Sequence, residues 1–310
     1  MILNSRNQWM DVAKGITILL MILGHAAIPE PLSNFIYSFH MPLFFIASGW
    51  MTNWNKYSIS DFAIRKAKSL AVPFIIYSSI VLVLLEQVKK SIYGGNNMIF
   101  SWLCDGWQGY ALWFIPVLFM SLFIVRFTYL ISKGWGRVVV CICLLIIGVS
   151  LKYFKVTLPW SLSTVPYASF LVLLGSYLRN FQSFIDYPKW IIMLGGGGIS
   201  LCISCFWRLD MAWNNILPVM PLTVGAVAGT VMLFSFSSFM IKYLQKVSEV
   251  FQYIGKETFV IVAFSQVIII LCNSYFICSS MIKYMILFIS LWSIIFIKNR
   301  MKVLTKLLMF

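Results

Sequence analysis

The sequence predicts an all-α integral membrane protein with about ten transmembrane helices in a single domain, residues 1–310. Hydrophobic residues make up 61% of the chain and charged residues only 11%, and the mean hydropathy is +0.89. The apolar residues form repeated runs, most of which are long enough for an α-helix to cross the hydrocarbon core, whereas the runs at 137–152, 162–178 and 282–298 are short. No stretch is long and polar enough for a separate soluble domain.

The distribution of basic residues predicts the orientation. We expect spans at residues 12–28, 32–53, 69–88, 110–131, 137–152, 162–178, 189–206, 217–240, 258–276 and 282–298. With the N-terminus inside, the inner segments hold 18 of the 24 Lys and Arg residues and the outer segments hold 6. Cytoplasmic loops are rich in Lys and Arg, so both termini are expected to face the cytoplasm from the cell inner (plasma) membrane. We therefore expect the net charge of +15 to set the membrane topology and to contact anionic lipid headgroups, rather than to bind nucleic acid.

The two histidines of the chain, His25 and His40, both fall inside apolar segments. Ionisable groups inside a membrane are costly, so both are candidates for function. Lys14 lies eleven residues before His25, which is three helical turns, so the two side chains project from nearly one face. Their separation along the axis is about 16 Å. Asp11, one turn before Lys14, is expected to pair with it. The structural alternative is a snorkelling lysine and histidines that only pack.

Two runs in this region are distinctive: D-x-x-K-G-I-x-I-L-x-x-x-L-G-H at 11–25 and F-H-M-P-L-F-F-I-x-S-G at 39–49. Together they resemble the acyltransferase-3 family of membrane proteins. The similar branch includes fucose 4-O-acetylase-like and polysaccharide O-acetyltransferases. The family's motif of a basic residue, a ten-residue gap and a histidine is matched by Lys14 and His25.

Further stretches similar to the family follow in the same order: RKAKSLAVPF at 65–74, YALWFIPVLFM at 110–120, the segment 158–179, and IGKETFVIVAFSQ at 254–266. In the family, the basic motif at the start of the third helix is associated with the acyl donor, acetyl-CoA. Arg65 and Lys68 are its matching ends, and lysine replaces the commoner second arginine. That substitution keeps the charge and loses bidentate geometry. Many relatives have a histidine where Gln266 stands, so the role of that position is open.

The resemblance implies a membrane O-acetyltransferase that moves an acetyl group from cytoplasmic acetyl-CoA to a hydroxyl of a cell-surface or exopolysaccharide sugar. The attacking hydroxyl must lose a proton, and a neutral imidazole is suited to take it. His25 is the expected base, and His40 orients it, acts as a second base or holds the acceptor. An acetyl-histidine intermediate is an alternative. Lys14, Arg65 and Lys68 are expected to bind the CoA phosphates.

The oxyanion stabiliser is left open among four polar residues of the second span. These are Asn34, Tyr37, Ser38 and Ser48. No metal site is expected, because the seven cysteines are scattered, and the C-x-x-C of Cys202 and Cys205 has no partner pair or neighbouring histidine.

Local features complete the prediction. Ser60 is the expected N-cap of a short basic helix, with a kink at Pro73. Trp102 and Trp107, in the long outer loop 89–109, are expected in an interfacial aromatic belt. The glycines of 195–198 and the G-x-x-x-G of 225–229 predict close helix packing.

Two other classes of protein fit the same pattern. A polytopic transporter or flippase for a sugar or lipid-linked substrate would also have ten spans, few buried charges and glycine-rich helices. Many transporters carry an internal repeat, and this sequence has no recognisable one. A non-catalytic assembly or export partner would tolerate the loss of both histidines. Activity that depends on CoA separates the enzyme from both.

Overall fold

Each of the ten predicted spans corresponds to a helix in the computed structural model, which describes residues 8–25, 28–93, 98–107, 110–182, 190–275 and 280–307. These helices are α1 (Gln8–Gly24), α2 (Glu30–Met51), α4 (Val72–Tyr93), α6 (Phe114–Ile131), α7 (Trp135–Tyr153), α8 (Val165–Leu178), α10 (Trp190–Phe206), α11 (Val219–Tyr243), α13 (Thr258–Tyr275) and α14 (Ser280–Leu307). The described residues form no sheet, so the all-α prediction is confirmed.

Seven helical segments of the described chain are long and apolar enough to cross a membrane, and they involve α4, α6, α7, α8, α11, α13 and α14. The helices α1 and α10 fall just short because each has 17 residues. The helix α2 has 22 residues, but it carries several polar side chains. The protein is therefore a multi-pass membrane protein, and its helices α1 and α2 are largely buried among the others.

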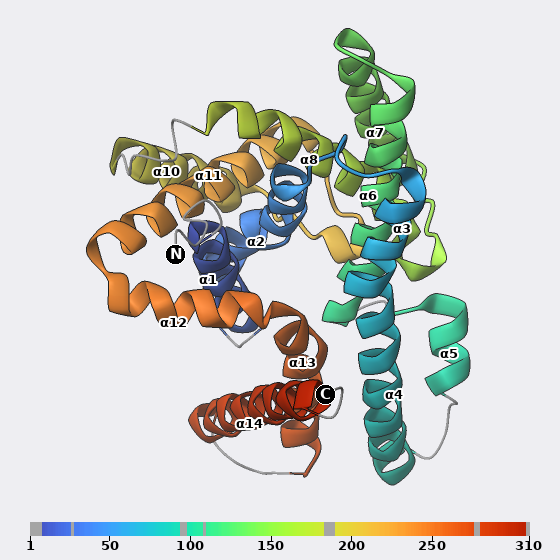
Figure 1. The fold of residues 1–310 in the computed structure, drawn as a ribbon, viewed down its shortest axis with the longest axis vertical. Coiled ribbons are helices and arrows are strands. Elements are labelled where there is room, and N and C mark those ends of the chain that lie inside the picture. The colour runs from blue at the N-terminus through green and yellow to red at the C-terminus, as the bar shows by residue number, and fades with distance from the viewer. Residues whose placement is uncertain are drawn as a thin grey trace.

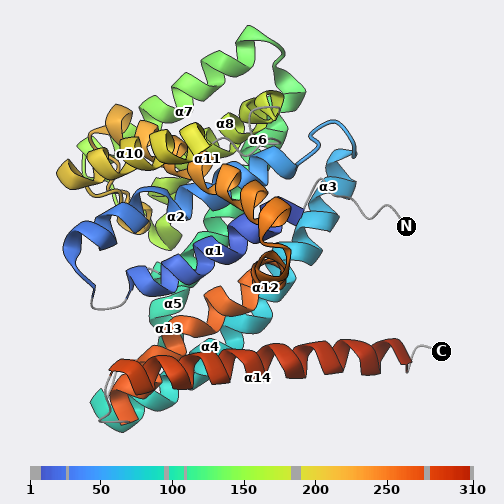
Figure 2. The same cartoon turned by 90° about the vertical axis from the view of Figure 1, so that its left-hand side faces the viewer.

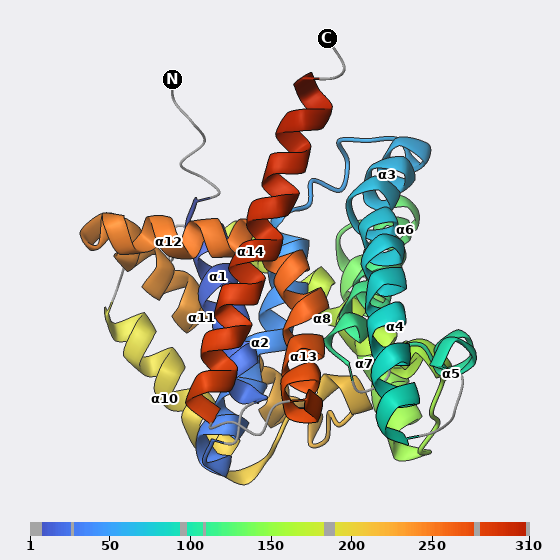
Figure 3. The same cartoon turned by 90° about the horizontal axis from the view of Figure 1, so that it is seen from below.

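Shorter helical elements join the spans. They are α3 (Ile59–Lys66), the π-helical segment η2 (Ala67–Ala71), α5 (Met98–Asp105), η3 (Ala111–Trp113), η4 (Pro159–Thr164), η5 (Arg179–Phe181), η6 (Met211–Trp213) and α12 (Gln245–Lys256). The amphipathic α12 lies across the end of the bundle at which α1 begins (Figure 3). The C-terminal end of α14 extends past α12 at that same end (Figures 2 and 3).

The central pair α1 and α2 is enclosed by α8, α10, α11, α12 and α13 (Figure 1). Glycines allow the helices to approach closely. A Cβ on Gly49 of α2 would lie 1.8 Å from the Val172 carbonyl oxygen of α8, and one on Gly175 would lie 2.1 Å from that of Ile46. Any larger side chain at these contacts would force the two backbones apart, so glycine sets the spacing of α2 and α8.

The same kind of contact fixes α12 against α1. A Cβ on Gly255 would lie 1.8 Å from the Asp11 carbonyl oxygen, and one on Gly15 would lie 2.0 Å from that of Phe251. The predicted glycine runs are confirmed in part. A Cβ on Gly229 would lie 2.7 Å from the side chain of Phe39, whereas one on Gly195 would meet no atom within 4 Å.

The start of the third span differs from the prediction in two details. The N-cap of α3 is Ser58 rather than Ser60, and the Ser58 hydroxyl accepts a hydrogen bond from the Asp61 N–H at 3.1 Å. The expected irregularity lies before Pro73, in the π-helical turn Ala67–Ala71. A wider turn accommodates a proline because the ring cannot fit against the carbonyl of a regular preceding turn.

The interfacial prediction for Trp107 is wrong. Trp107 is buried, with 2% of its surface exposed, and its indole N–H donates to the Ser78 hydroxyl at 2.9 Å. Trp102 packs against both Trp107 and Trp160, with ring centroids 6.3 and 5.2 Å away. The expected outer loop thus contains the helix α5, which folds back and covers the ends of α4 and η4.

Candidate active site

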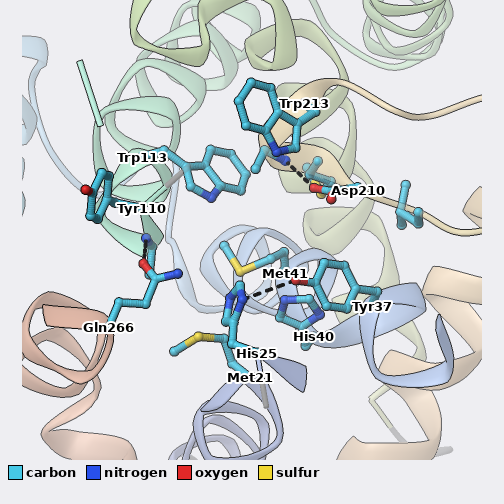
Figure 4. A pocket seen from close by; sticks show the side chains of 14 residues that line it. Met21, His25, Tyr37, His40, Met41, Tyr110, Trp113, Asp210, Trp213 and Gln266 are labelled. Carbon is cyan, nitrogen blue, oxygen red and sulfur yellow. Dashed lines mark hydrogen bonds between the residues drawn. The ribbon is translucent and has the colours of Figure 1, made fainter. Parts of the chain in front are cut away.

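A cavity of about 70 Å³ lies at the end of the bundle that the charge distribution places outside, between α1, α2, η3, α13 and the connection from α10 to α11. His25 and His40 both line it, although they come from different helices (Figure 4). Its other lining residues are Met21, Tyr37, Met41, Tyr110, Ala111, Trp113, Leu209, Asp210, Met211, Ala212, Trp213 and Gln266. The structure therefore brings together the two predicted catalytic residues in one cavity.

Tyr37 holds His25 in place. His25 directly follows Gly24, the last residue of α1. The Tyr37 hydroxyl lies 3.2 Å from Nδ1 of His25. This contact leaves Nε2 of His25 as the ring nitrogen available to a substrate. The Tyr37 ring also packs edge-on against the His40 ring, with centroids 4.8 Å apart. Tyr37 therefore contacts both imidazoles.

His40 is anchored to its own helix. It is 3% exposed, and its Nδ1 lies 2.9 Å from the carbonyl oxygen of Ile36, one turn earlier. A carbonyl accepts only, so Nδ1 carries the hydrogen and Nε2 of His40 is an acceptor. The described contacts make Tyr37, and not His40, the residue that orients His25.

The connection between α10 and α11 supplies two charged residues next to this cavity. The Arg208 guanidinium lies 3.9 Å above the centre of the Tyr37 ring, and it donates to Asn34 Oδ1 at 3.2 Å. Asp210 accepts from the Ala212 N–H at 3.2 Å and so caps η6. Burial raises the pKa of the Asp210 carboxyl, although the neighbouring Arg208 opposes that shift.

Gln266 enters the cavity from α13. Its Oε1 accepts a hydrogen bond from the backbone N–H of Ala111, at the start of η3. Because the oxygen faces Ala111, the amide nitrogen is directed toward the middle of the cavity, on the side where His25 lies (Figure 4). Gln266 thus joins η3 to α13 and presents an N–H donor to the cavity.

A second and larger cavity, of about 470 Å³, lies toward the ends of α1, α2 and α13 that the charge distribution predicts to face the cytoplasm, and we call it the inner cavity. Its polar groups include Lys14 of α1, Lys66 of α3 and Lys256 of α12, with Ser48 and Asn53 on the α2 side. The predicted pairing of Lys14 is confirmed, since its Nζ lies 2.6 Å from Asp11 Oδ1. Three ammonium groups in one apolar-walled cavity favour an anionic ligand.

Arg65 and Lys68 do not line the inner cavity. Both are exposed, on the helical segment that carries Lys66 into the cavity wall. The Arg65 guanidinium stacks on Tyr57, 4.2 Å from the ring centre, and Tyr57 is itself a lining residue. The two predicted ends of the basic motif therefore lie beside the cavity, and the lysine between them reaches it.

A thin aromatic layer separates the two cavities, which have no lining residue in common. On α2, His40 lines the outer cavity and Phe44, one turn later, lines the inner one. Trp113 lines the outer cavity and Phe114 the inner one, and the rings of Phe44 and Phe114 lie 5.6 Å apart. Phe44 and Phe114 therefore lie at the boundary between the two cavities.

The sequence patterns did not single out Arg208, Asp210 or Trp213 as site residues. One signal was available, since Arg208 and Asp210 are the only charged residues between the seventh and eighth predicted spans. Of the four candidates for the oxyanion stabiliser, only Tyr37 lines the outer cavity, whereas Ser48 lines the inner one.

The comparison with known families agrees with this architecture. A family model described as an acyltransferase domain, Acyl_transf_3, matches residues 7–298, which include every helix that lines the two cavities. Among curated proteins and among solved structures, none matches the chain significantly. The match to the family model extends over nearly the whole chain, and the chain therefore belongs to the acyltransferase-3 family of membrane acyltransferases.

Proposed function

We propose that this protein is an O-acetyltransferase of the cell inner (plasma) membrane that transfers an acetyl group from cytoplasmic acetyl-CoA to a hydroxyl of a cell-surface or exopolysaccharide sugar. The observation that carries the proposal is the alignment of two cavities along α1, α2, α13 and the segment formed by η3 and α6, in which η3 lines the outer cavity and α6 lines the inner one. The outer cavity holds both histidines, and the inner cavity holds three lysines. Family membership favours this enzyme over the transporter that the sequence pattern also fits.

The donor would enter from the cytoplasmic end. Lys14 and Lys66 in the inner cavity, with Arg65 and Lys68 beside it, provide the positive charge that the CoA phosphates need. The thin pantetheine arm would then follow α1 toward His25, a distance of about 16 Å along the helix axis. The rings of Phe44 and Phe114 must separate to admit it, and their packing around the bound arm would exclude water from the thioester.

In the outer cavity, Nε2 of His25 takes the proton of the sugar hydroxyl as its oxygen attacks the thioester carbonyl carbon. The carbonyl oxygen gains negative charge in the tetrahedral intermediate, and the amide N–H of Gln266 donates to it. The carbon–sulfur bond then breaks, and the proton passes from His25 to the CoA sulfur. His40 Nε2, an acceptor in the same cavity, holds a second hydroxyl of the acceptor sugar.

Acetyl-CoA titration of the purified protein in lipid nanodiscs tests the donor half of this proposal. We expect saturable binding of acetyl-CoA with a higher affinity than that of ATP. This affinity should fall in the Lys14→Ala and Arg65→Ala variants. Lys283→Ala, which removes a charge on the opposite side of the predicted membrane, is the matched control. Protein that is folded and does not bind acetyl-CoA in the presence or absence of an acceptor would favour the transporter.

A further inference from the structure

We propose that a third cavity, of about 130 Å³, binds an anionic sugar residue of the acceptor, next to the residue that is acetylated. This inference rests on the proposed function and names its substrate class. The cavity lies between the C-terminal end of α7, the segment that leads into α8, and η6. Lys152, Lys155, Ser161, Trp213 and Asn214 are the lining residues that carry the argument.

The third cavity adjoins the catalytic cavity. Ala212 and Trp213 line both of them. The Trp213 side chain is 57% exposed, so one indole offers a flat apolar surface at the boundary between the two cavities. Aromatic faces pack well against the C–H faces of sugar rings. A chain with one sugar in the catalytic cavity would thus place its neighbour in the third cavity, across Trp213.

The charge of the third cavity is positive. Lys152 and Lys155 line it, and no Asp or Glu does. Among the described residues, neither ammonium group forms a salt bridge, although Lys152 is close enough to Asp210 to affect the ionisation of its carboxyl. Two ammonium groups without a bound carboxylate, in a concave site, attract an anionic ligand.

The wall of the cavity also has unused hydrogen-bonding capacity. Asn214 and Ser161 are 6% and 2% exposed, and neither side-chain polar atom of Asn214 nor the Ser161 hydroxyl has a partner among the described residues. Buried polar groups normally find a partner, and bound molecules commonly supply it. A small outward shift of either side chain would let it reach a ligand in the cavity.

The backbone around the cavity is strained in a way that supports a binding role. In the described chain, the non-glycine residues with positive φ are Lys155, Trp160, Ser161 and Asn214, with φ of 53°, 59°, 55° and 49°. Three of the four line this cavity. Such conformations cost free energy in non-glycine residues, and they cluster at active sites and ligand-binding loops.

These features together select the ligand chemistry. A carboxylate or a phosphate diester provides the negative charge that Lys152 and Lys155 need and the acceptor oxygens that Asn214 and Ser161 can donate to. A neutral sugar would leave both ammonium groups unpaired in the site. The acceptor is therefore an acidic glycan, whose anionic group is the carboxylate of a uronic acid or a bridging phosphate.

Binding of defined oligosaccharides tests this inference without requiring catalysis. The protein is placed in nanodiscs of neutral lipid and titrated with a glucuronate-containing tetrasaccharide, the same tetrasaccharide with its carboxylates reduced to alcohols, and a glycerol-phosphate-linked oligosaccharide. At least one anionic probe should bind about tenfold or more tightly than the reduced one, and the tighter of the two identifies the anion.

Two double variants each remove two positive charges, one pair inside the third cavity and the other pair away from it. Lys152→Gln/Lys155→Gln should abolish the preference for the anionic probe, whereas Lys133→Gln/Lys246→Gln, at exposed inner positions, should preserve it. Lys155→Glu, a reversal at one exposed residue, repeats the test if the double variant does not fold. Equal binding of all three probes, or an unchanged preference in folded Lys155→Glu, would overturn the inference.

The same samples separate this inference from the proposed function. Acetyl-CoA binding and acetyl transfer are measured alongside. Preferential binding of an anionic probe without any acetyl transfer from bound acetyl-CoA would support the anionic site and contradict the enzyme. Acetyl transfer to the reduced tetrasaccharide at the rate of the anionic one would support the enzyme and overturn the anionic site.

Discussion

Tyr37 of α2 fixes the orientation of His25 at the end of α1, with its hydroxyl 3.2 Å from the imidazole Nδ1. If His25 is to accept a proton at Nε2, then Nδ1 must carry its hydrogen and donate it to the Tyr37 oxygen. Arg208 stacks on the Tyr37 ring from the outer connection and restrains it in turn. The proposed base, His25, is therefore positioned by a residue on one neighbouring helix and a cation on a loop.

Replacing Tyr37 with Phe should lower kcat about 10- to 100-fold, because His25 loses the partner that selects its tautomer and ring orientation. The KM for acetyl-CoA should not change, since Tyr37 does not line the inner cavity. The pH dependence of kcat should also move, which a purely structural change would not produce. Tyr129→Phe, which removes a hydroxyl that donates to Ser176, is the control. Unchanged kcat and pH profile in Tyr37→Phe would contradict this role.

Both polar atoms of the Gln266 amide should matter for activity, the oxygen as an acceptor for the Ala111 N–H and the nitrogen as a donor in the cavity. Gln266→Met removes the donor in the cavity and the acceptor for the Ala111 N–H, and kcat should fall about 10²- to 10³-fold. Gln266→His should retain much of the activity, because a neutral imidazole also offers one acceptor and one donor. Steady-state kinetics of the two variants, with thermal unfolding as a check, decides the matter. If folded Gln266→Met keeps nearly wild-type kcat, Gln266 is not the donor.

Lys66 lines the inner cavity, whereas the motif residues on either side of it, Arg65 and Lys68, do not. We therefore expect Lys66 to contribute more to acetyl-CoA binding than Lys68. Lys66→Gln should raise the KM for acetyl-CoA about tenfold, and the effect should shrink at high salt because it is electrostatic. Lys68→Gln should have a smaller effect, since Lys68 is exposed beside the cavity. Kinetics in nanodiscs at two salt concentrations would measure both. A larger effect of Lys68→Gln would mean that the phosphates bind outside this cavity.

The contact between α2 and α8 should be the more sensitive of two glycine positions. Gly49→Ala would place a Cβ 1.8 Å from the Val172 carbonyl oxygen, and the overpacking should destabilise the protein by about 1–3 kcal/mol or more. Gly195→Ala meets no atom within 4 Å, so it should be neutral or stabilising by up to about 1 kcal/mol. Thermal unfolding of the two variants in one detergent gives the comparison. Equal melting temperatures would contradict the close helix contact.

The helices could be predicted from the sequence because apolar runs and helix length follow local rules. The segments at 12–28 and 32–53 were found as α1 and α2, and the shared cavity of His25 and His40 follows from the packing of neighbouring spans. Pairing of Lys14 with Asp11 was predictable for the same reason, since i,i+3 neighbours on a helix meet.

The parts that escaped prediction depend on contacts between distant segments. Arg208 reaches Tyr37 across more than 170 residues, and no local pattern encodes that approach. The π-helical turn Ala67–Ala71 changes the direction of side chains after Lys66, so the spacing of the basic motif could not show which cation reaches the cavity. Trp107 was placed at the interface because its burial depends on Ser78 of another helix.

Acetyl transfer by proteoliposomes that contain either wild-type protein or His25→Ala tests the central claim most directly. Labelled acetyl-CoA is supplied on one side of the bilayer and an acceptor oligosaccharide on the other, and acetyl-CoA affinity is measured separately. We expect wild-type protein to label the acceptor, and His25→Ala to bind acetyl-CoA normally while transfer falls by about 10²-fold or more. Transfer at the wild-type rate by His25→Ala would contradict the assignment of His25 as the base.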